Sequence, residues 1–223
     1  MPAPNGPHTP DLFAHHTPEP TTQQIGAQAW VLRGFALPWV DQLLPALQAI
    51  QATSPFRHMV TVRGFTLSVA LTNCGSLGWT SDHRGYRYSP LDPLREAPWP
   101  AMPEAFSELA TAAALAAGFA DFAADACLIN HYLPGSRLSL HQDRNERSFE
   151  HPIVSVSLGL PAVFQFGGFE RSDKALRIPL LHGDVAVWGG ADRLRYHGVL
   201  PLKAGEHPLL GARRINLTMR KAG

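Results

Sequence analysis

Apolar positions recur with a helical period in two segments of the chain, one after Pro38 and one after Pro103. Residues three and four apart share one side of a helix, so each segment predicts a helix with one buried side. The second segment has Gly118 near its end, where helices commonly stop. The positions expected to face inward are Val40, Leu43, Leu44, Leu47 and Ile50 in the first helix, and Phe106, Leu109, Ala113 and Ala116 in the second.

From Cys127 onward the pattern changes to short apolar runs separated by Gly, Pro and Asp, which is typical of strands. The central predicted strands cover residues 153–160, 163–166, 177–181, 185–188 and 215–219, and an earlier one covers residues 30–32. Residues 65–72 are a further predicted strand, and residues 79–88 a loop or hairpin. Helices followed by a run of strands indicate an α+β fold, but the pattern alone allows several kinds of β-sandwich.

The last predicted strand, from Arg214 to Arg220, has two different faces, because alternate side chains of a strand point in opposite directions. One face carries Ile215, Leu217 and Met219, and the other carries Arg214, Asn216, Thr218 and Arg220. Arginine binds a carboxylate through two parallel hydrogen bonds, so two arginines on a buried face predict a dicarboxylate ligand. The alternative is a half-exposed edge strand with solvated arginines.

Three residues predict a metal site, namely His141 and Asp143 at the end of an extended run, and the distant His197. If the run over residues 136–140 is a strand, His141 and Asp143 point to the same face. Two histidines and one carboxylate form the facial triad that binds non-haem Fe(II) and leaves positions open for substrate and O2. A lone His-x-Asp is more often surface polarity than a ligand pair, but the accompanying arginines favour the metal site.

Short motifs extend this picture through most of the chain. In the second half they are Asn130-His131-Tyr132-Leu133-Pro134-Gly135, Ser155-Val156-Ser157-Leu158-Gly159, Phe164-Gln165-Phe166-Gly167-Gly168, His182-Gly183-Asp184-Val185, Tyr196-His197-Gly198 and Arg214-x-Asn216-Leu217-Thr218-x-Arg220. In the first half they are Ser54-Pro55-Phe56-Arg57, Thr72-Asn73-Cys74-Gly75, Leu77-Gly78-Trp79 and Gly85-Tyr86-Arg87-Tyr88-Ser89-Pro90. With His141-x-Asp143, these motifs resemble the bacterial AlkB family of Fe(II)- and 2-oxoglutarate-dependent nucleic-acid dealkylases.

The resemblance implies a double-stranded β-helix, or jelly roll, with flanking helices and an N-terminal nucleotide-recognition lid over residues 54–92. We expect a flexible tail over residues 1–25, which lack apolar periodicity, followed by a single dioxygenase domain over residues 26–223. The implied cofactors are Fe(II), 2-oxoglutarate as cosubstrate, and O2. The metal ligands, which are also the catalytic residues, would be His141, Asp143 and His197.

The resemblance also implies a binding site for 2-oxoglutarate. Arg214 would hold the far carboxylate with help from Asn216 and Tyr132, and Asn130 and Arg220 would hold the end near the metal. The alternative for Asn130 is a turn cap, and the alternative for Tyr132 is an aromatic core residue.

The implied reaction is oxidative demethylation of N-alkylated bases such as 1-methyladenine and 3-methylcytosine in DNA or RNA, with release of formaldehyde. The target base must be single-stranded or flipped out of the duplex, since the metal cannot reach a stacked base. Trp79 and His141 would stack on the base, with Tyr86 and Arg171 near the base or its phosphate; plain core is the alternative for Trp79. The other candidate substrate contacts are Thr61, Arg87, Tyr88 and Asn145.

Composition limits how nucleic acid could bind. The formal net charge is only +1, so binding needs a local basic patch, and the sixteen Arg against three Lys suit phosphate contacts. The patch candidates are Arg57, Arg63, Arg84, Arg87, Arg144 and Arg147. There is no signal-peptide pattern and no apolar stretch long enough to span a membrane, so we expect a cytoplasmic monomer with no membrane partner. The two cysteines fit reduced, buried thiols.

Two positions depart from the family pattern. Asn145 stands where close relatives have an acidic residue, and Arg195 stands where an apolar one is expected, which predicts a more polar pocket wall. Because an amide both donates and accepts, the preference among alkylated bases is open. Two alternative functions are a hydroxylase acting on a small molecule or protein side chain, and a non-catalytic jelly-roll binding module.

Overall fold

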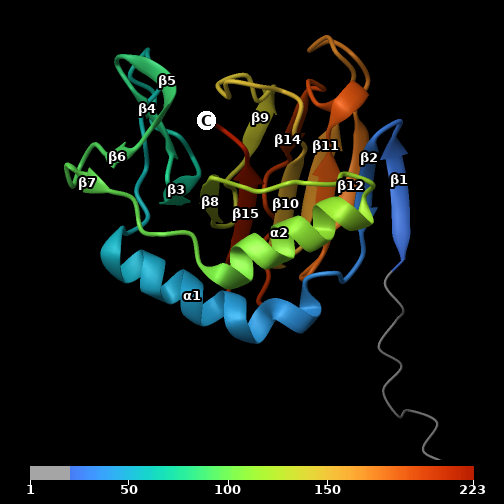
Figure 1. The fold of residues 1–223 in the computed structure, drawn as a ribbon, viewed down its shortest axis with the longest axis horizontal. Helices are drawn as coiled ribbons and strands as arrows, with labels where there is room; N and C mark the ends of the chain where they lie inside the picture. Colours follow the sequence, from blue (N-terminus) through green and yellow to red (C-terminus); the bar gives the residue numbers. More distant parts are fainter. Residues whose placement is uncertain (1–20) are drawn as a thin grey trace, which may run out of the picture.

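Two antiparallel sheets lie face to face in the computed structural model, which describes residues 21–223 (Figure 1). The larger sheet has the strand order β1 (Thr22–Gly26), β2 (Ala29–Leu32), β13 (Val185–Trp188), β10 (Ile153–Gly159), β15 (Arg214–Arg220), β8 (Ala126–Tyr132) and β3 (Ala70–Gly75). The smaller sheet has the order β12 (Leu176–Leu180), β11 (Ala162–Phe166), β14 (His197–Val199) and β9 (Leu138–His141). Two further strand pairs join β4 (Gly78–Asp82) to β5 (Gly85–Ser89), and β6 (Leu91–Asp92) to β7 (Ala97–Pro98).

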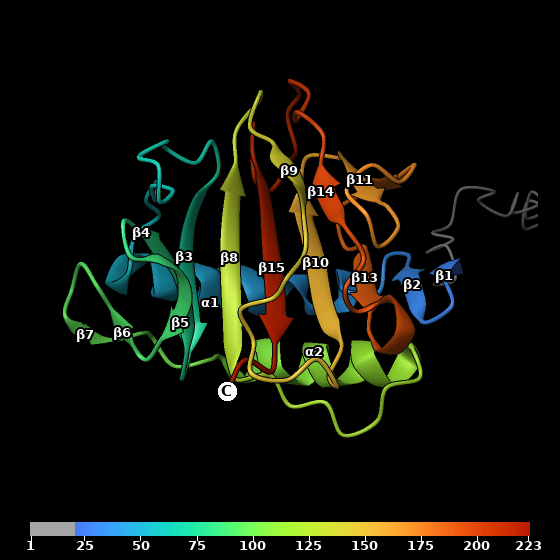
Figure 2. The ribbon, with the colours of Figure 1, turned by 90° about the horizontal axis from the view of Figure 1, so that it is seen from above.

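Helices α1 (Val40–Thr53) and α2 (Glu104–Ala116) cover the outer face of the larger sheet, and Figure 2 shows both helices behind its strands. Two short 3-10 helices, η1 (Leu37–Trp39) and η2 (Gly190–Asp192), lie in connections. The helices pack against the apolar side chains of alternate strand positions, such as Val156 on β10 and Leu217 on β15. No helix among residues 21–223 has the length and apolar character needed to cross a membrane.

A second apolar layer lies between the two sheets. Phe164 and Phe166 of the smaller sheet pack there with Trp188 of the larger one, and Tyr132 packs with Val199. Paired antiparallel sheets with helices on the outside form the predicted α+β fold with a jelly-roll core, which is confirmed.

The two predicted helices are confirmed, with one correction at an inward position. In α1, Val40, Leu43, Leu47 and Ile50 are buried, and Leu44 is half-buried against the same core. In α2, Phe106, Leu109 and Ala113 are buried, but Ala116 is exposed. Ala116 lies at the margin of the apolar stripe in the last turn, and Ala117 takes the buried position. Gly118 follows with a φ of 84°, the left-handed conformation that ends many helices.

The central predicted strands are confirmed as β2, β10, β11, β12, β13 and β15, and residues 79–88 form the β4–β5 hairpin. The strand predicted over residues 65–72 is wrong for its first part, because β3 begins only at Ala70. Residues before Ala70 instead form a turn in which Val60 bridges Thr66, and Phe65 is 69% exposed. The apolar Phe65 is therefore exposed and Leu67 is half-buried, and only Val69, directly before β3, is buried.

The predicted tail boundary at residue 25 is also corrected, because Thr22–Gly26 form strand β1. Its first three residues are exposed and polar, as suits an edge strand, and only Ile25 reaches the layer between the sheets. Because most residues of β1 are polar, the sequence pattern did not predict this strand. The rest of the predicted tail, residues 1–20, lies outside the described residues.

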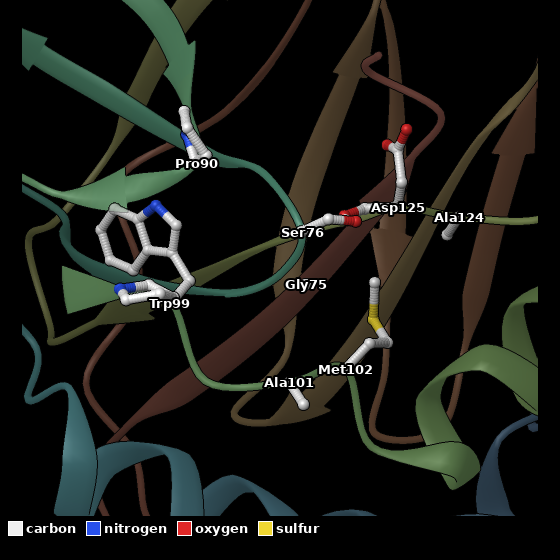
Figure 3. A pocket seen from close by; sticks show the side chains of 9 residues that line it. Gly75, Ser76, Pro90, Trp99, Ala101, Met102, Ala124 and Asp125 are labelled. Atoms are coloured by element: carbon white, nitrogen blue, oxygen red, sulfur yellow. The ribbon is translucent and has the colours of Figure 1, made fainter.

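Cys74 and Cys127 are free and buried, as predicted, and they lie opposite each other on β3 and β8. Near the ends of these strands is a cavity of about 400 Å³, with Pro90 and Trp99 on one side and Met102 and Asp125 on another (Figure 3). The Asp125 carboxylate already accepts hydrogen bonds from the backbone of Ala222 and Gly223. The cavity includes none of the predicted site residues.

The packing of α2 predicts a stability difference between its two sides. Phe106→Ala removes a fully buried ring from the core beneath the sheet, so we expect the free energy of unfolding to fall by about 3–5 kcal/mol. Leu115→Ala on the same helix removes a side chain that is 65% exposed, and should change it by less than about 0.5 kcal/mol. Urea unfolding followed by circular dichroism measures both, and equal losses would contradict this packing.

Candidate metal centre

The three predicted metal ligands come together at the inner edge of the smaller sheet. His141 on β9 and His197 on β14 are paired in register, and their ring centroids are 4.4 Å apart. Asp143 lies two residues beyond the end of β9, with Oδ1 3.6 Å from Nε2 of His141 and Oδ2 3.7 Å from Nε2 of His197. Among residues 21–223, this is the only group of three or more His, Cys, Asp or Glu side chains placed to share an ion.

Backbone carbonyls fix the orientation of both imidazoles. Nδ1 of His141 lies 2.9 Å from the carbonyl oxygen of Ser139, and Nδ1 of His197 lies 3.1 Å from that of Arg195. A proton on each Nδ1 donates to these carbonyls and leaves each Nε2 lone pair free for a metal. Burial, together with His141, lowers the pKa of His197 to about 3, so its ring stays neutral.

Arg220 keeps the carboxylate ligand charged. Its Nη2 and Nε donate to Oδ2 of Asp143 at 2.6 and 3.0 Å. Burial of Asp143 opposes ionisation, but Arg220 and the two imidazoles hold the pKa of this carboxyl well below its usual range. An ionised carboxylate and two imidazole Nε2 atoms form a donor set that fits Fe(II). The expected contact of Arg220 with 2-oxoglutarate remains a prediction.

Arg214 is a buried cation with unused donors. Its side chain is 1% exposed, Nη2 donates to Oγ of Ser157 at 2.9 Å, and the guanidinium carbon lies 4.9 Å from the ring centroid of Tyr132. Nε and Nη1 have no hydrogen-bond partner among residues 21–223. Leaving a buried charged donor unpaired is costly, so this arrangement calls for an anionic ligand. The far carboxylate of 2-oxoglutarate fits that requirement.

Strand register brings the remaining predicted cosubstrate residues to the same place. On β8 and β15, Tyr132 pairs with Arg214 and Asn130 pairs with Asn216. Nδ2 of Asn216 donates to Oγ of Ser155 at 2.8 Å, and Nδ2 of Asn130 lies 3.5 Å from Oδ1 of Asn216. Asn130 is therefore within a strand and is not a turn cap. Because β15 is central and buried throughout, the edge-strand alternative is wrong.

The β4–β5 hairpin carries two of the predicted substrate residues, and one of them is hydrogen-bonded to the segment that follows the ligand Asp143. The rings of Trp79 and Tyr86 stack with centroids 5.6 Å apart and an angle of 12° between their planes. Nε1 of Trp79 donates to Oδ1 of Asn145 at 3.0 Å, and Asn145 is two residues from Asp143. Trp79 is thus part of a half-exposed aromatic stack and is not plain core.

Other predicted substrate residues are engaged within the protein. The Tyr88 hydroxyl donates to Oε1 of Glu146 at 3.0 Å, and Nη2 of Arg87 pairs with Asp82 at 2.7 Å. Thr61 accepts the N–H of Phe65 at 3.1 Å within the turn before β3. Of these three residues, Tyr88 is connected to the ligand Asp143, because Glu146 also binds Arg220. Arg171 is exposed, with its guanidinium carbon 5.5 Å from the ring centroid of Tyr196.

The predicted basic patch is reduced by ion pairing. Nη2 of Arg57 binds the buried Asp92 at 2.6 Å, and Arg87 is held by Asp82, so neither is a free cation. The members that stay exposed are Arg63, Arg84, Arg144 and Arg147.

Sequence reasoning missed a buried charge network behind the metal ligands. Oε1 of Glu146 lies 3.3 Å from Nε of Arg220, and Oε2 lies 3.3 Å from Nη2 of Arg193. Nη1 of Arg193 also donates to the backbone carbonyl of Asp143 at 3.1 Å. Glu146 and Arg193 lie in irregular segments, where no periodic pattern marks burial. A Glu so close to the His-x-Asp motif was the only available signal.

The expectation that Arg195 makes the pocket wall polar is not supported by its contacts. Its side chain binds Asp192 and the carbonyl oxygen of Gly167, and its guanidinium carbon lies 5.6 Å from the ring centroid of Phe166 and 5.1 Å from that of Phe169. The positive charge of its guanidinium group is therefore compensated by the carboxylate of Asp192 and by cation–π contacts with two aromatic rings.

Comparison with known proteins agrees with this geometry. A family model described as the 2OG-Fe(II) oxygenase superfamily matches residues 28–220. The alpha-ketoglutarate-dependent dioxygenase AlkB of Escherichia coli (strain K12) is 56% identical over 213 residues, which cover 96% of this chain and 98% of that protein. The chain belongs to the AlkB family of 2OG-Fe(II) oxygenases.

Further relatives of this AlkB-family chain show the same relationship. The AlkB homolog of Caulobacter vibrioides (strain NA1000 / CB15N) is 44% identical over 181 residues, covering 81% of this chain and 80% of that protein. The solved structure of OsALKBH1 superposes with a TM-score of 0.79 at 27% identity and covers 90% of this chain and all of that one. The chain is therefore a dioxygenase that uses Fe(II), 2-oxoglutarate and O2.

The buried position of Arg214 leads to a prediction about the KM for 2-oxoglutarate. Arg214→Gln keeps a polar side chain but removes the charge that would pair with the far carboxylate. Loss of one partner of a buried charge pair costs about 2–5 kcal/mol, so we expect the KM for 2-oxoglutarate to rise at least about thirtyfold. Succinate formation measures it, and Arg213→Gln, at the preceding residue, should leave it unchanged. An unaltered KM in Arg214→Gln would contradict the assignment.

Proposed function

We propose that this AlkB-family dioxygenase removes alkyl groups from N-alkylated bases, such as 1-methyladenine and 3-methylcytosine, in DNA or RNA. The observation that carries the proposal is the stacked pair Trp79 and Tyr86, which is hydrogen-bonded through Trp79 to Asn145, two residues from the ligand Asp143. Flat aromatic surfaces bind any nucleobase by stacking, and this pair is joined to the segment that follows a metal ligand.

When bound, Fe(II), 2-oxoglutarate and O2 supply the oxidant that hydroxylates the N-alkyl carbon, and the hydroxylated product releases formaldehyde. The protein orients these groups. His141, Asp143 and His197 would hold the metal from one side, because their donor atoms converge there. Arg214, which is buried between the sheets, would anchor the far carboxylate of the cosubstrate.

The proposed substrate is a single-stranded or flipped nucleotide, because the alkylated base must reach the metal. A base within a duplex cannot reach the metal, so the target nucleotide is single-stranded or flipped into the site. The exposed cations Arg63, Arg84, Arg144, Arg147 and Arg171 are candidates for phosphate contacts, since a net charge of +1 provides no general attraction. Asn145 would set the base preference, because its amide both donates and accepts.

The two alternatives agree less well with the structure. A hydroxylase of small molecules or protein side chains needs the triad and Arg214 but has no use for the stacked pair on the hairpin. A non-catalytic jelly roll explains neither the converging triad nor the unpaired donors of Arg214.

All proposed site residues follow residue 25, within the single dioxygenase domain that we propose, and the monomeric state expected from the sequence stays a prediction. The cytoplasmic location expected from the sequence stays a prediction.

The direct test is formaldehyde release from single-stranded DNA carrying 1-methyladenine or 3-methylcytosine, with Fe(II), 2-oxoglutarate and ascorbate. We expect release by the wild type and none by Asp143→Ala, because the carboxylate ligand is lost. The ratio of the two bases reports the preference set by Asn145. Turnover of 2-oxoglutarate without formaldehyde from either oligonucleotide would instead favour the small-molecule or protein hydroxylase.

The aromatic stack predicts a separate effect on substrate binding. Trp79→Ala removes the ring, and since base stacking contributes about 1–3 kcal/mol, the KM for the oligonucleotide should rise about 5–150-fold. Trp79→Phe keeps a ring without the N–H that binds Asn145, so it should recover most of the affinity. The KM for 2-oxoglutarate in the absence of DNA should not change in either variant. An unchanged KM for the oligonucleotide in Trp79→Ala would show that the target base does not stack on Trp79.

A further inference from the structure

His197 depends for its orientation on a residue outside the strands. Its Nδ1 faces the carbonyl oxygen of Arg195, which lies between η2 and the start of β14. The equivalent carbonyl for His141 belongs to Ser139, which lies within strand β9. The peptide that carries this carbonyl is held on one side by the N–H of Tyr196, which donates to the carbonyl oxygen of Gly168 at 2.8 Å. On the other side, the N–H of Arg195 bonds only to the carbonyl of Asp192, at 3.1 Å, within a turn. The segment that enters this peptide is therefore outside the strand pairing.

The Arg195 side chain adds a further restraint on this segment. Nε binds Oδ1 of Asp192, and Nη1 donates to the carbonyl oxygen of Gly167 at 2.9 Å. The guanidinium also lies near the rings of Phe166 and Phe169. A planar guanidinium held by two acceptors and two aromatic faces has little rotational freedom.

Asp192 provides an anchor that is fixed independently of Arg195. It is 1% exposed, and its Oδ2 accepts the N–H of Gln28, in the turn between β1 and β2, at 2.6 Å. Gly26 makes room for this carboxylate, because a Cβ there would lie 2.4 Å from Oδ2. Asp192 thus connects the edge of the larger sheet to the segment that precedes the metal ligand.

We infer that Asp192 and Arg195 are positioning residues of the metal centre, which hold the Arg195 carbonyl where it directs Nε2 of His197 to the metal. Neither residue contacts the triad through its side chain. The inference rests on the metal centre and not on the identity of the substrate, so it can fail or hold independently of the dealkylase proposal.

The test is Co(II) binding to the metal-free full-length protein, measured by isothermal titration calorimetry. Arg195→Leu keeps apolar contact with both rings but removes the ion pair. Changing the groups that orient a metal-bound histidine typically weakens metal affinity by about 10–100-fold, so we expect the Kd to rise at least tenfold. Arg195→Lys keeps the charge without the planar fork and should give an intermediate Kd. Arg177→Leu, an exposed arginine on β12, should match the wild type.

A second variant separates positioning from stability. Arg195→Leu alone leaves a buried, unpaired carboxylate and is expected to lower the Tm of the metal-free protein. The double variant Asp192→Asn with Arg195→Leu has no unpaired charge, and its amide can still accept from Gln28. We expect its Tm to recover while its Kd for Co(II) stays raised. A wild-type Kd in the double variant would overturn the inference and leave the pair with a purely structural role.

Discussion

The burial of charge between the two sheets determines how the whole site is built. Strand β15 turns Arg214, Asn216, Thr218 and Arg220 toward the interior of the sandwich, and its apolar residues toward the helices. A cation in that interior needs an anion, since water is excluded. Arg220 has Asp143, which in turn meets the two imidazoles, whereas Arg214 keeps two donors without partners. The protein thus supplies the anion that pairs with Arg220, whereas Arg214 is left to pair with a ligand.

Much of this arrangement follows from periodicity that the sequence displays. Alternation in residues 214–220 placed the arginines together, and the helical period located α1 and α2. The His-x-Asp motif identified two ligands of the triad, although Asp143 lies beyond the strand and reaches its position through Arg220 and Arg193. Family resemblance, and not periodicity, selected the jelly roll among possible sandwiches.

The features that sequence reasoning missed depend on pairing between segments with no shared pattern. Arg57 forms an ion pair with Asp92, and Arg87 forms one with Asp82. The sequence does not reveal these pairs, so both arginines were predicted to be available for phosphate contacts. Strand β1 was hidden because its first three residues are polar and exposed at the sheet edge, and Phe65, in the segment before β3, is apolar but exposed. In each case tertiary contacts override local composition.

The hydroxyl of Tyr88 reaches the metal ligands through a continuous set of partners. It binds Glu146, Glu146 binds Arg220, and Arg220 binds Asp143, so a hairpin on the rim and a carboxylate at the centre share one buried electrostatic assembly. Such an assembly resists partial rearrangement, because displacing any member leaves another buried and unpaired. The β4–β5 hairpin and the metal ligands therefore behave as one rigid unit. The arrangement of the metal-binding atoms is fixed before a base binds.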